Sequence, residues 1–540
     1  MKNQKIYFFY GLLAISFLFL LARLFEAQII FGEKNRSLAE GNRIKKEIMP
    51  APRGMIYDRN GKELVRNVPI YRKIVQSTKC KVQSKECFEI ISREEALAME
   101  ARGETENLRM DISRQYLYGM ALAHVIGYLG EANENEVKEN KFKAGDLVGR
   151  MGVEEQYDRI LRGKEGGEVY EVDAQGRKIR QIGRTEAIPG QDIHLSIDAE
   201  LSKIAYESLD NKLGAVVATT AKDNQILVLV SSPSFDPNIM VNRTGEQENQ
   251  KIEEFLNDPL KPFFNRAIGG VYPPGSTFKI VVSVAGLEEN KIDENTVWND
   301  TGEIKVGNYS YKNWYLTEYG RVEGEVNLVK ALKRSTDTFF YKAGEWIGPN
   351  LIVKWAKNFG LGQKTNIDLP GEASGLVPDP NSKNSQTGER WYLGNTYHLA
   401  IGQGDLLATP LQINLMTTVI ANNGKLCKVS VKEQDNKKLK DCQDLKIKTE
   451  TLRLVKEGMK EACETGGTAF PFFDFSPQIA CKTGTAQFAD KEKTHAWFTS
   501  FAPLDKPEIV ATAIIEGGGE GSAQAAPVVK KMMEAWFHGN

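Results

Sequence analysis

Ser276 and Lys279 are the two residues of this chain whose types and spacing best suit chemistry. They stand three positions apart in segment 272–279, which reads Tyr-Pro-Pro-Gly-Ser-Thr-Phe-Lys. The apolar run at residues 280–285 predicts a buried helix that begins here, so both side chains would share one helical face. A serine hydroxyl becomes a good nucleophile when a nearby base takes its proton, and a lysine can be that base when burial keeps it partly neutral. The segment therefore predicts a serine nucleophile with a lysine base at a helix N-terminus, where backbone N–H groups stabilise an oxyanion.

Two further motifs follow in order along the chain. Ser335-Thr336-Asp337 comes first, and Lys482-Thr483-Gly484 comes near the C-terminus. A lone Ser-x-x-Lys pattern occurs often by chance, but the ordered triple is typical of penicillin-binding proteins and class A β-lactamases.

The likeness extends along nearly the whole chain, which resembles the class B penicillin-binding proteins, membrane-anchored peptidoglycan D,D-transpeptidases. The additional matching segments are residues 51–54, 58–61, 265–267, 369–372, 401–404 and 409–412. The resemblance implies a mixed α/β fold. It would consist of one transmembrane helix, an extended N-terminal pedestal, and a transpeptidase domain with an antiparallel sheet, flanking helices and an inserted helical subdomain.

The resemblance also implies roles for the residues of the three motifs. Ser276 would attack the carbonyl between two D-alanines of a stem peptide, and Lys279 would take its proton. Ser335 would relay a proton to the leaving amine, while Lys482 would supply positive charge near Ser335 and the substrate carboxylate. A second stem peptide would then accept the acyl group through an amine, which forms the cross-link.

Substrate binding is assigned by the same resemblance to the strand that carries the third motif. Thr483 and Thr485 would offer hydroxyls to the substrate carboxylate, and the backbone N–H groups of Ser276 and Thr485 would form the oxyanion site. Gly484 would let the substrate backbone lie against the strand edge, because it has no side chain.

The second motif departs from most relatives, since it ends in Asp337 where they carry asparagine. This aspartate resembles the elongation-type enzymes, those like penicillin-binding protein 2, rather than the division type. Its carboxylate would raise the pKa of Lys279, which works against a base. A rival motif, Ser382-Lys383-Asn384, lies in a Pro/Asn/Ser-rich stretch that we expect to be a loop.

Hydrophobic periodicity predicts a sheet built from both ends of the C-terminal region. A closing helix is expected at residues 526–537, and helices are expected in the middle third. The glycines at 517–519 predict a strand-to-helix connection, because no phosphate-loop motif follows them. The expected strands are residues 214–218, 225–231, 479–485, 496–501 and 509–515.

Length and composition indicate more than one domain and no affinity for nucleic acid. The chain has 540 residues, with 70 basic and 71 acidic side chains. Residues 6–22 form an uncharged apolar run after Lys2 and Lys5, which is long enough to span a bilayer; a cleaved signal peptide is the alternative. The positive-inside tendency would place the N-terminus in the cytoplasm and the rest outside the inner membrane. We predict an anchor at 1–25, a pedestal at 26–190 and a transpeptidase domain at 191–540.

Six cysteines suit such an exported chain. Cys427 and Cys442 flank a predicted hairpin and are expected to be bridged, and Cys80 and Cys87 are a second possible pair. Cys481 is expected to face away from Lys482 as a small core residue without a catalytic role.

Neither a cofactor nor a metal site is expected. No histidine or cysteine lies between Ile280 and Ser335, so the sequence offers no zinc site there. His495 is expected to be structural. The implied partners are stem peptides, β-lactam antibiotics, a membrane-embedded glycan polymerase and other elongation-complex proteins. The alternatives are a division-type transpeptidase, a β-lactamase, and a catalytically silent β-lactam sensor or scaffold.

Overall fold

Contacts divide the chain into two compact units, one made of residues 1–54 and 159–191, the other of residues 55–158 and 192–540. The domain boundaries at 25/26 and 190/191 stay a prediction. The computed structural model describes residues 2–35, 43–75, 87–104, 107–139, 141–143, 145–173, 177–241, 246–433, 442–487 and 493–539.

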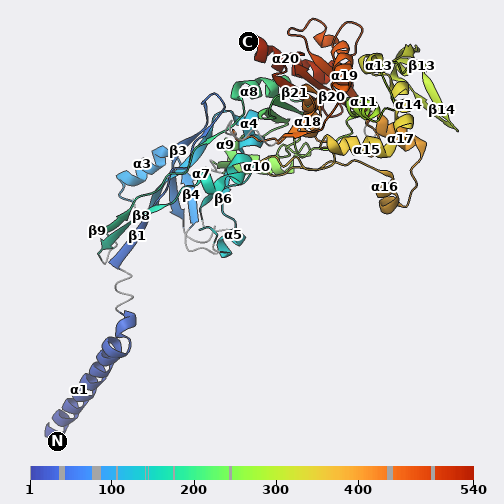
Figure 1. The fold of residues 1–540 in the computed structure, drawn as a ribbon. Helices are drawn as coiled ribbons and strands as arrows, with labels where there is room; N and C mark the ends of the chain where they lie inside the picture. The colour runs from blue at the N-terminus through green and yellow to red at the C-terminus, as the bar shows by residue number, and fades with distance from the viewer. Residues whose placement is uncertain are drawn as a thin grey trace. The chain divides into compact units, whose positions relative to one another are not determined.

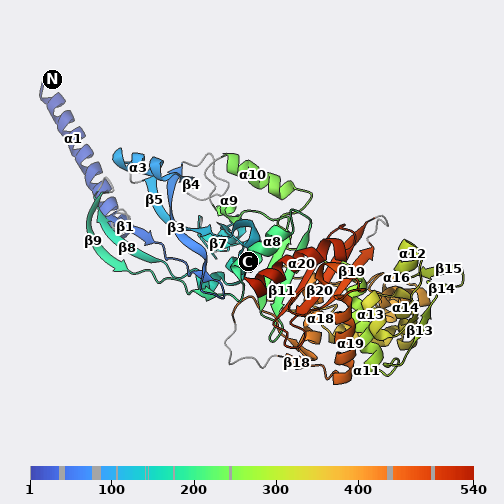
Figure 2. The ribbon, with the colours of Figure 1, turned by 90° about the horizontal axis from the view of Figure 1, so that it is seen from above.

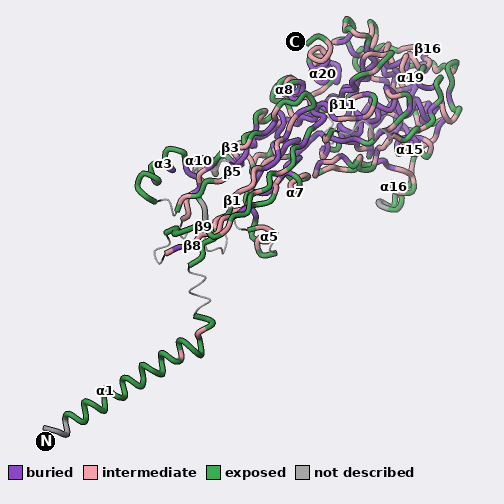
Figure 3. The backbone as a smooth tube through the Cα atoms, turned by 60° about the vertical axis from the view of Figure 1, so that its left-hand side comes forward, coloured by how far each residue is buried: buried purple, intermediate pink, exposed green. Residues whose placement is uncertain are grey.

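The first unit contains a long apolar helix and a small sheet. Helix α1 (Lys2–Phe25) continues into a π-helical segment (Glu26–Ile30), and residues 6–30 are long and apolar enough to span a membrane. This stretch is exposed along most of its length, as expected for a helix whose apolar surface faces lipid (Figure 3). The sheet is antiparallel and consists of β1 (Ile44–Met49), β8 (Gly166–Val172) and β9 (Lys178–Thr185).

The second unit is organised around a five-stranded antiparallel sheet in the order β12-β11-β21-β20-β19 (Figures 1 and 2). Its strands match the five predicted ones, which come from both ends of this region. The central β21 is buried along its whole length, which explains its continuous apolar pattern. The bounds are β11 (Gly214–Thr220), β12 (Ile226–Ser232), β19 (Ala480–Gln487), β20 (Thr494–Ala502) and β21 (Ile509–Ile515).

The two faces of this sheet differ in character. On one face, α8 (Ala199–Ser208) and α20 (Gly521–His538) cover an apolar core that contains Val216 and Phe498. On the other face, α18 (Pro410–Ala421) is buried and packs through hydrogen bonds as well as apolar contacts. The amide of Asn414 donates to the backbone oxygens of Val217 and Val510.

The helical insertion carries the first two motifs and is joined to the sheet by α19. Short strand pairs β13–β16 and β14–β15 lie at its outer part (Figure 1). Its elements are α11 (Lys279–Glu288), β13 (Trp298–Asp300), β14 (Glu303–Val306), β15 (Tyr309–Lys312), α12 (Trp314–Tyr319), β16 (Gly324–Val326), α13 (Leu328–Arg334), α14 (Asp337–Ile347), α15 (Pro349–Asn358), α16 (Pro380–Thr387), α17 (Leu393–Ala400) and α19 (Thr449–Ala462).

The rest of the second unit contains a mixed sheet and several short helices. The sheet runs in the order β10-β2-β3-β4, with β5 also paired to β3. Its strands are β2 (Ile56–Tyr57), β3 (Glu63–Val75), β4 (Cys87–Ile91), β5 (Leu108–Tyr116) and β10 (Ile193–His194). A separate antiparallel pair consists of β6 (Leu129–Glu131) and β7 (Leu147–Gly149). The helices are α3 (Arg93–Ala101), α4 (Gly119–Ile126), α5 (Glu134–Lys138), α6 (Gly152–Gln156), α9 (Pro237–Val241) and α10 (Glu246–Asn257), and α7 (Asp158–Leu161) begins at the unit boundary.

The cysteine predictions are partly confirmed and partly wrong. Cys427 and Cys442 are bridged, and they face each other where β17 (Lys425–Cys427) pairs with β18 (Cys442–Asp444). Cys481 belongs to the core as predicted, but it is bridged to Cys463 rather than being a free core residue. The pairing follows from contact between α19 and β19, which no local pattern reveals. Cys80 lies outside the described residues, so its predicted pairing with Cys87 stays a prediction.

Removing the Cys427–Cys442 bridge is expected to lower the free energy of unfolding by about 3 kcal/mol. The bridge closes a loop with a sequence separation of 15, and a crosslink of this length restricts the unfolded chain. Serine replacements at both positions, followed by equilibrium unfolding, would measure the loss. Peptide mapping of the unreduced wild type should recover the linked pair, and two free thiols would contradict the bridge.

Candidate active site

The nucleophile turn is held by hydrogen bonds to two distant segments. Ser276 lies in a 3₁₀ turn (Gly275–Phe278) that leads directly into α11, so it occupies the predicted helix N-terminus. The indole N–H of Trp497 donates to the oxygen of Pro273 (2.9 Å), and the N–H of Gly275 donates to the oxygen of Gly402 (2.8 Å). The half-buried Ser276 is therefore presented on a fixed turn beside β19.

Lys279 occupies the first position of α11 and is completely buried. Its amine donates to the backbone oxygen of Ser335 (2.7 Å), to the Ser335 hydroxyl (3.2 Å) and to Oδ1 of Asp337 (2.7 Å). The Nζ atom also lies 5.2 Å from the centroid of the Phe340 ring. The first two predicted motifs are thus in direct contact.

Ser335 connects the second motif to the third. It ends α13 with a left-handed backbone (φ 55°), which costs a non-glycine residue about 1 kcal/mol. The hydroxyl accepts a hydrogen bond from the amine of Lys482 at 2.9 Å as well as from Lys279. The Lys482 amine also donates to the oxygen of Thr483 (3.0 Å) and is completely buried. One serine hydroxyl therefore lies between two buried lysines, as a proton relay requires.

Burial and charge together set the protonation of the two lysines. Burial lowers the pKa of Lys279, and the carboxylate of Asp337 opposes this effect. Burial also holds the pKa of Lys482 well below its usual range; the nearby Lys279 lowers it further, and Asp337 opposes both effects. Asp337 therefore acts on Lys279 in the predicted direction, but desolvation outweighs it.

Replacing Asp337 with asparagine is expected to change both the rate and the pH dependence of acylation. The amide removes the charge that raises the pKa of Lys279, so Lys279 would become neutral at lower pH. The limb of the profile on which acylation rises with pH should therefore move to lower pH, and the rate should fall because the ion pair to Lys279 is lost. Acylation by a β-lactam, followed across pH, would measure both effects.

Ser382→Ala and Asn384→Ala provide the matched controls, because their residues form the rival motif. Both should acylate with the wild-type profile, since Asn384 is exposed and the Ser382 hydroxyl bonds to the backbone of Asp379 in its own helix cap. An unaltered profile for Asp337→Asn together with a large loss at Asn384 would assign the second motif to residues 382–384.

The rival motif is not in a loop, so that prediction is wrong. Residues 380–387 form α16, whose N-cap is Asp379. The Asp379 carboxylate accepts from the backbone N–H of Ser382, and the Ser382 hydroxyl accepts from the backbone N–H of Asp379, which together form a capping box. This capping box and Pro380 at the first helical position stabilise a sequence of low helix propensity. The Ser382 hydroxyl is thus committed to helix capping.

The strand of the third motif forms the end of the central sheet, next to the nucleophile turn. Thr485 is exposed, and its backbone oxygen accepts from the amide of Gln403 (3.3 Å). The hydroxyls of Thr483 and Thr468 are hydrogen-bonded to each other, with their oxygens 2.9 Å apart. Gln403 and Thr468 were not predicted as site residues; the 401–404 segment was noted, but its spacing from the motifs does not reveal the contact.

Gly484 has a packing requirement in addition to its predicted role toward the substrate. A Cβ there would lie 2.9 Å from Cβ of Trp497, 3.0 Å from Cγ2 of Thr277 and 3.1 Å from the oxygen of Pro274. The missing side chain therefore lets β19 approach the turn that carries Ser276, and the predicted contact with the substrate backbone stays a prediction. His495 lies opposite Ala486 on β20, and its Nδ1 accepts from the N–H of Gly517 (3.2 Å), in the connection between β21 and α20. Its structural role stays a prediction.

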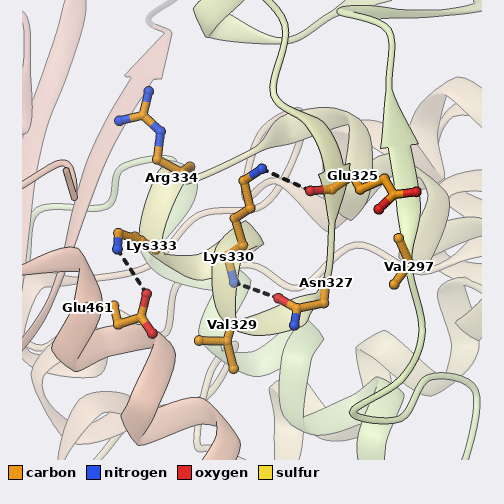
Figure 4. Close-up of a pocket in the computed structure, with 8 residues that line it drawn as sticks. All are labelled: Val297, Glu325, Asn327, Val329, Lys330, Lys333, Arg334 and Glu461. Atoms are coloured by element: carbon orange, nitrogen blue, oxygen red, sulfur yellow. Dashed lines mark hydrogen bonds and ion pairs between the residues drawn. The ribbon is translucent and has the colours of Figure 1, made fainter.

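A cavity of about 510 Å³ borders α13 but lies outside the catalytic cluster (Figure 4). The three basic side chains that line this cavity are already bonded to other protein groups. Lys333 pairs with Glu461 at 3.0 Å, Arg334 pairs with Glu323 at 2.8 Å, and Lys330 donates to backbone oxygens. The chemistry therefore belongs to the buried cluster and not to this cavity, which is lined by Val297, Glu325, Asn327, Val329, Lys330, Lys333, Arg334 and Glu461.

Comparison with known families agrees with this geometry. Residues 214–534 match the penicillin binding protein transpeptidase domain, and residues 48–107 and 86–195 match the penicillin-binding protein dimerisation domain. The chain belongs to the class B penicillin-binding proteins. Over 99% of its length it is 31% identical to the peptidoglycan D,D-transpeptidase MrdA of Acinetobacter baumannii, of which the match covers 87%.

Solved structures place the chain in the elongation-type group. Penicillin-binding protein 2 of Helicobacter pylori, in complex with MreC, has a TM-score of 0.81 at 29% identity, covering 92% of this chain and 99% of that one. A chain of a peptidoglycan synthase complex has a TM-score of 0.78 at 28% identity, covering 99% and 98%. This class B penicillin-binding protein is an elongation-type peptidoglycan D,D-transpeptidase, which confirms the predicted fold and enzyme class.

Proposed function

We propose that this enzyme cross-links peptidoglycan stem peptides through an acyl-enzyme on Ser276 and releases D-alanine. The Ser276 oxygen attacks the carbonyl carbon between two D-alanines, the new C–O bond forms and the C–N bond breaks. The serine proton passes to Lys279, and the leaving amine receives a proton through Ser335. An amine of a second stem peptide then attacks the ester and regenerates the serine.

The observation that carries this proposal is the convergence of two buried lysines on one serine hydroxyl. Lys279 and Lys482 both donate to Ser335, and burial lowers the pKa of each. An amine that is partly neutral can accept the nucleophile's proton, and a hydroxyl between two amines can pass a proton in either direction. Strand β19, which carries Lys482, also carries residues 483–485. Thr483 and Thr485 would bind the substrate carboxylate, and the substrate backbone would lie against Gly484.

The test is to locate the covalent adduct and detect the leaving group. The full-length protein in detergent would be treated with benzylpenicillin, digested and mapped by mass spectrometry, and D-alanine release from a pentapeptide would be followed separately. We expect one adduct, on the peptide that contains Ser276, together with D-alanine release. An adduct on another residue, or the absence of both products, would refute the proposal.

The proposed setting is the inner membrane, with the catalytic domain outside the cytoplasm. The candidate span at residues 6–30 and the basic residues that precede it support this topology. Protease added to spheroplasts should therefore degrade nearly all of the chain, and full protection would contradict the topology. The relatives solved with MreC and in a peptidoglycan synthase complex support elongation-complex partners here too. We expect a membrane-embedded glycan polymerase to be among them.

A further inference from the structure

Asn313 connects the second motif to a buried carboxylate that the reaction does not use. Its Oδ1 accepts from the backbone N–H of Asp337 (3.1 Å), and its Nδ2 donates to Oδ2 of Asp300 (3.0 Å). Asn313 is completely buried and Asp300 is 1% exposed. The two residues lie 13 positions apart, on the insertion between α11 and α13.

Each carboxylate oxygen of Asp300 accepts two hydrogen bonds. Oδ1 accepts from the N–H of Gly302 (2.8 Å) and from the hydroxyl of Thr338 (2.7 Å). Oδ2 accepts from Asn313 and from the N–H of Glu323 (2.9 Å). A carboxylate that accepts at both oxygens is an acceptor only, so it orients the Asn313 amide with its nitrogen toward Asp300 and its oxygen toward Asp337.

The same turn also holds the carboxylate of Asp337. Trp314 follows Asn313, and its N–H donates to Oδ2 of Asp337 at 3.2 Å. The other oxygen, Oδ1, accepts from Lys279 at 2.7 Å. The backbone nitrogen and one carboxylate oxygen of Asp337 are therefore both bonded to residues 313–314, while the remaining oxygen faces the proposed base.

We propose that Asn313, oriented by Asp300, is a positioning residue for acylation. It acts through Asp337, which sets both the location and the protonation of the Lys279 amine. This inference rests on the proposed function, because it assumes that Lys279 serves Ser276. Three hydrogen bonds of 2.7 to 3.1 Å connect the residues in a contact chain that runs from Asp300 through Asn313 and Asp337 to Lys279.

Replacing Asn313 with aspartate turns this chain of contacts into a pH-dependent one. The introduced carboxyl would lie within hydrogen-bond distance of Asp300, and two buried carboxylates so close share a proton with a raised apparent pKa. While it is protonated, the introduced group can donate to Asp300 and accept from Asp337, as the amide does. Once it ionises, the two carboxylates repel each other and the contact to Asp337 is lost.

The experiment measures the acylation rate by a fluorescent penicillin from about pH 5 to about pH 9, with full-length protein in detergent. We expect the Asn313→Asp rate, divided by the wild-type rate at the same pH, to be near one at the acidic end. It should fall by about tenfold or more as the shared proton is lost. Asn313→Ala should be slow at every pH. Ser310→Ala is the control, since it removes a hydrogen bond to Glu303 on the same insertion without touching the contact chain, and it should match the wild type.

The outcomes separate positioning from a purely structural role. The inference is overturned if the acylation rate of Asn313→Asp, divided by the wild-type rate, stays constant across pH, whether that ratio is one or much lower. This test holds even if Asn313→Ala does not fold. Wild-type rates for Asn313→Ala would also overturn it. Ser276→Ala is measured alongside. If that variant is still labelled, the proposed function itself fails. If Asn313→Asp and Asn313→Ala both acylate like the wild type while Ser276 carries the label, only the inference about Asn313 fails.

Discussion

Ser276→Ala is expected to abolish covalent labelling by penicillin and the release of D-alanine. The acyl group is bonded to the serine oxygen, so a variant without that oxygen has no atom to form the ester. Labelling should fall below detection while the unfolding midpoint stays close to that of the wild type, because Ser276 is only half-buried and deleting its hydroxyl leaves no large cavity. Fluorescent penicillin followed by gel analysis would measure the loss.

Ser283→Ala is the matched control for this result. Ser283 is buried in α11 one turn after Lys279, and its hydroxyl donates to the backbone oxygen of Lys279 at 2.7 Å. Removing that hydroxyl should preserve labelling, since the bond is local to the helix. Label that persists in Ser276→Ala would place the nucleophile elsewhere.

Lys279→Met is expected to slow acylation by about 10² to 10⁴-fold, the usual contribution of a general base. Methionine is of similar length but cannot accept the proton of Ser276. It also leaves Asp337 without its amine partner and the Ser335 hydroxyl with Lys482 alone. The residual rate should also lose the rise with pH that the wild type owes to deprotonation of Lys279. Rates of β-lactam acylation across pH would show both changes.

Lys330→Met is the control for Lys279→Met, because it removes a lysine amine from the same insertion at a position outside the cluster. The Lys330 amine donates to backbone oxygens of Glu323 and Glu325, and acylation should remain at the wild-type rate. A Lys279→Met variant that acylates within about tenfold of the wild type would instead favour Lys482 as the base.

Features with a local cause were predictable from the sequence. The strands of the central sheet appeared as short apolar runs, and α11 appeared as an apolar segment after a Pro-Pro-Gly turn, because burial on a strand or a helix leaves a periodic pattern. The three motifs were recognisable because each is a short run of defined residue types, and because they follow one another in a fixed order. Their meeting at Ser335 followed from the family resemblance, since nothing local places Lys482 147 positions away within 2.9 Å of that hydroxyl.

Features that depend on distant contacts or on capping were missed. Helix α16 forms because Asp379 and Ser382 cap it, which outweighs a composition that favours turns. The Cys463–Cys481 bridge and the Asp300–Asn313 contact join residues with no common pattern. Gly484 was singled out for its missing side chain, but the atoms that require its absence come from β20 and the nucleophile turn.

The position of β19 at the end of the sheet has a consequence for inhibition. A strand edge recognises a ligand through peptide N–H and C=O groups, which every residue except proline supplies in full. Thr483 and Thr485 can be replaced by other side chains, but replacement leaves this row of groups in place. A compound that binds mainly through the backbone edge of residues 483–487 would therefore depend on few atoms that a point substitution can remove. Resistance to such a compound would have to come from displacement of the strand or from changes around it.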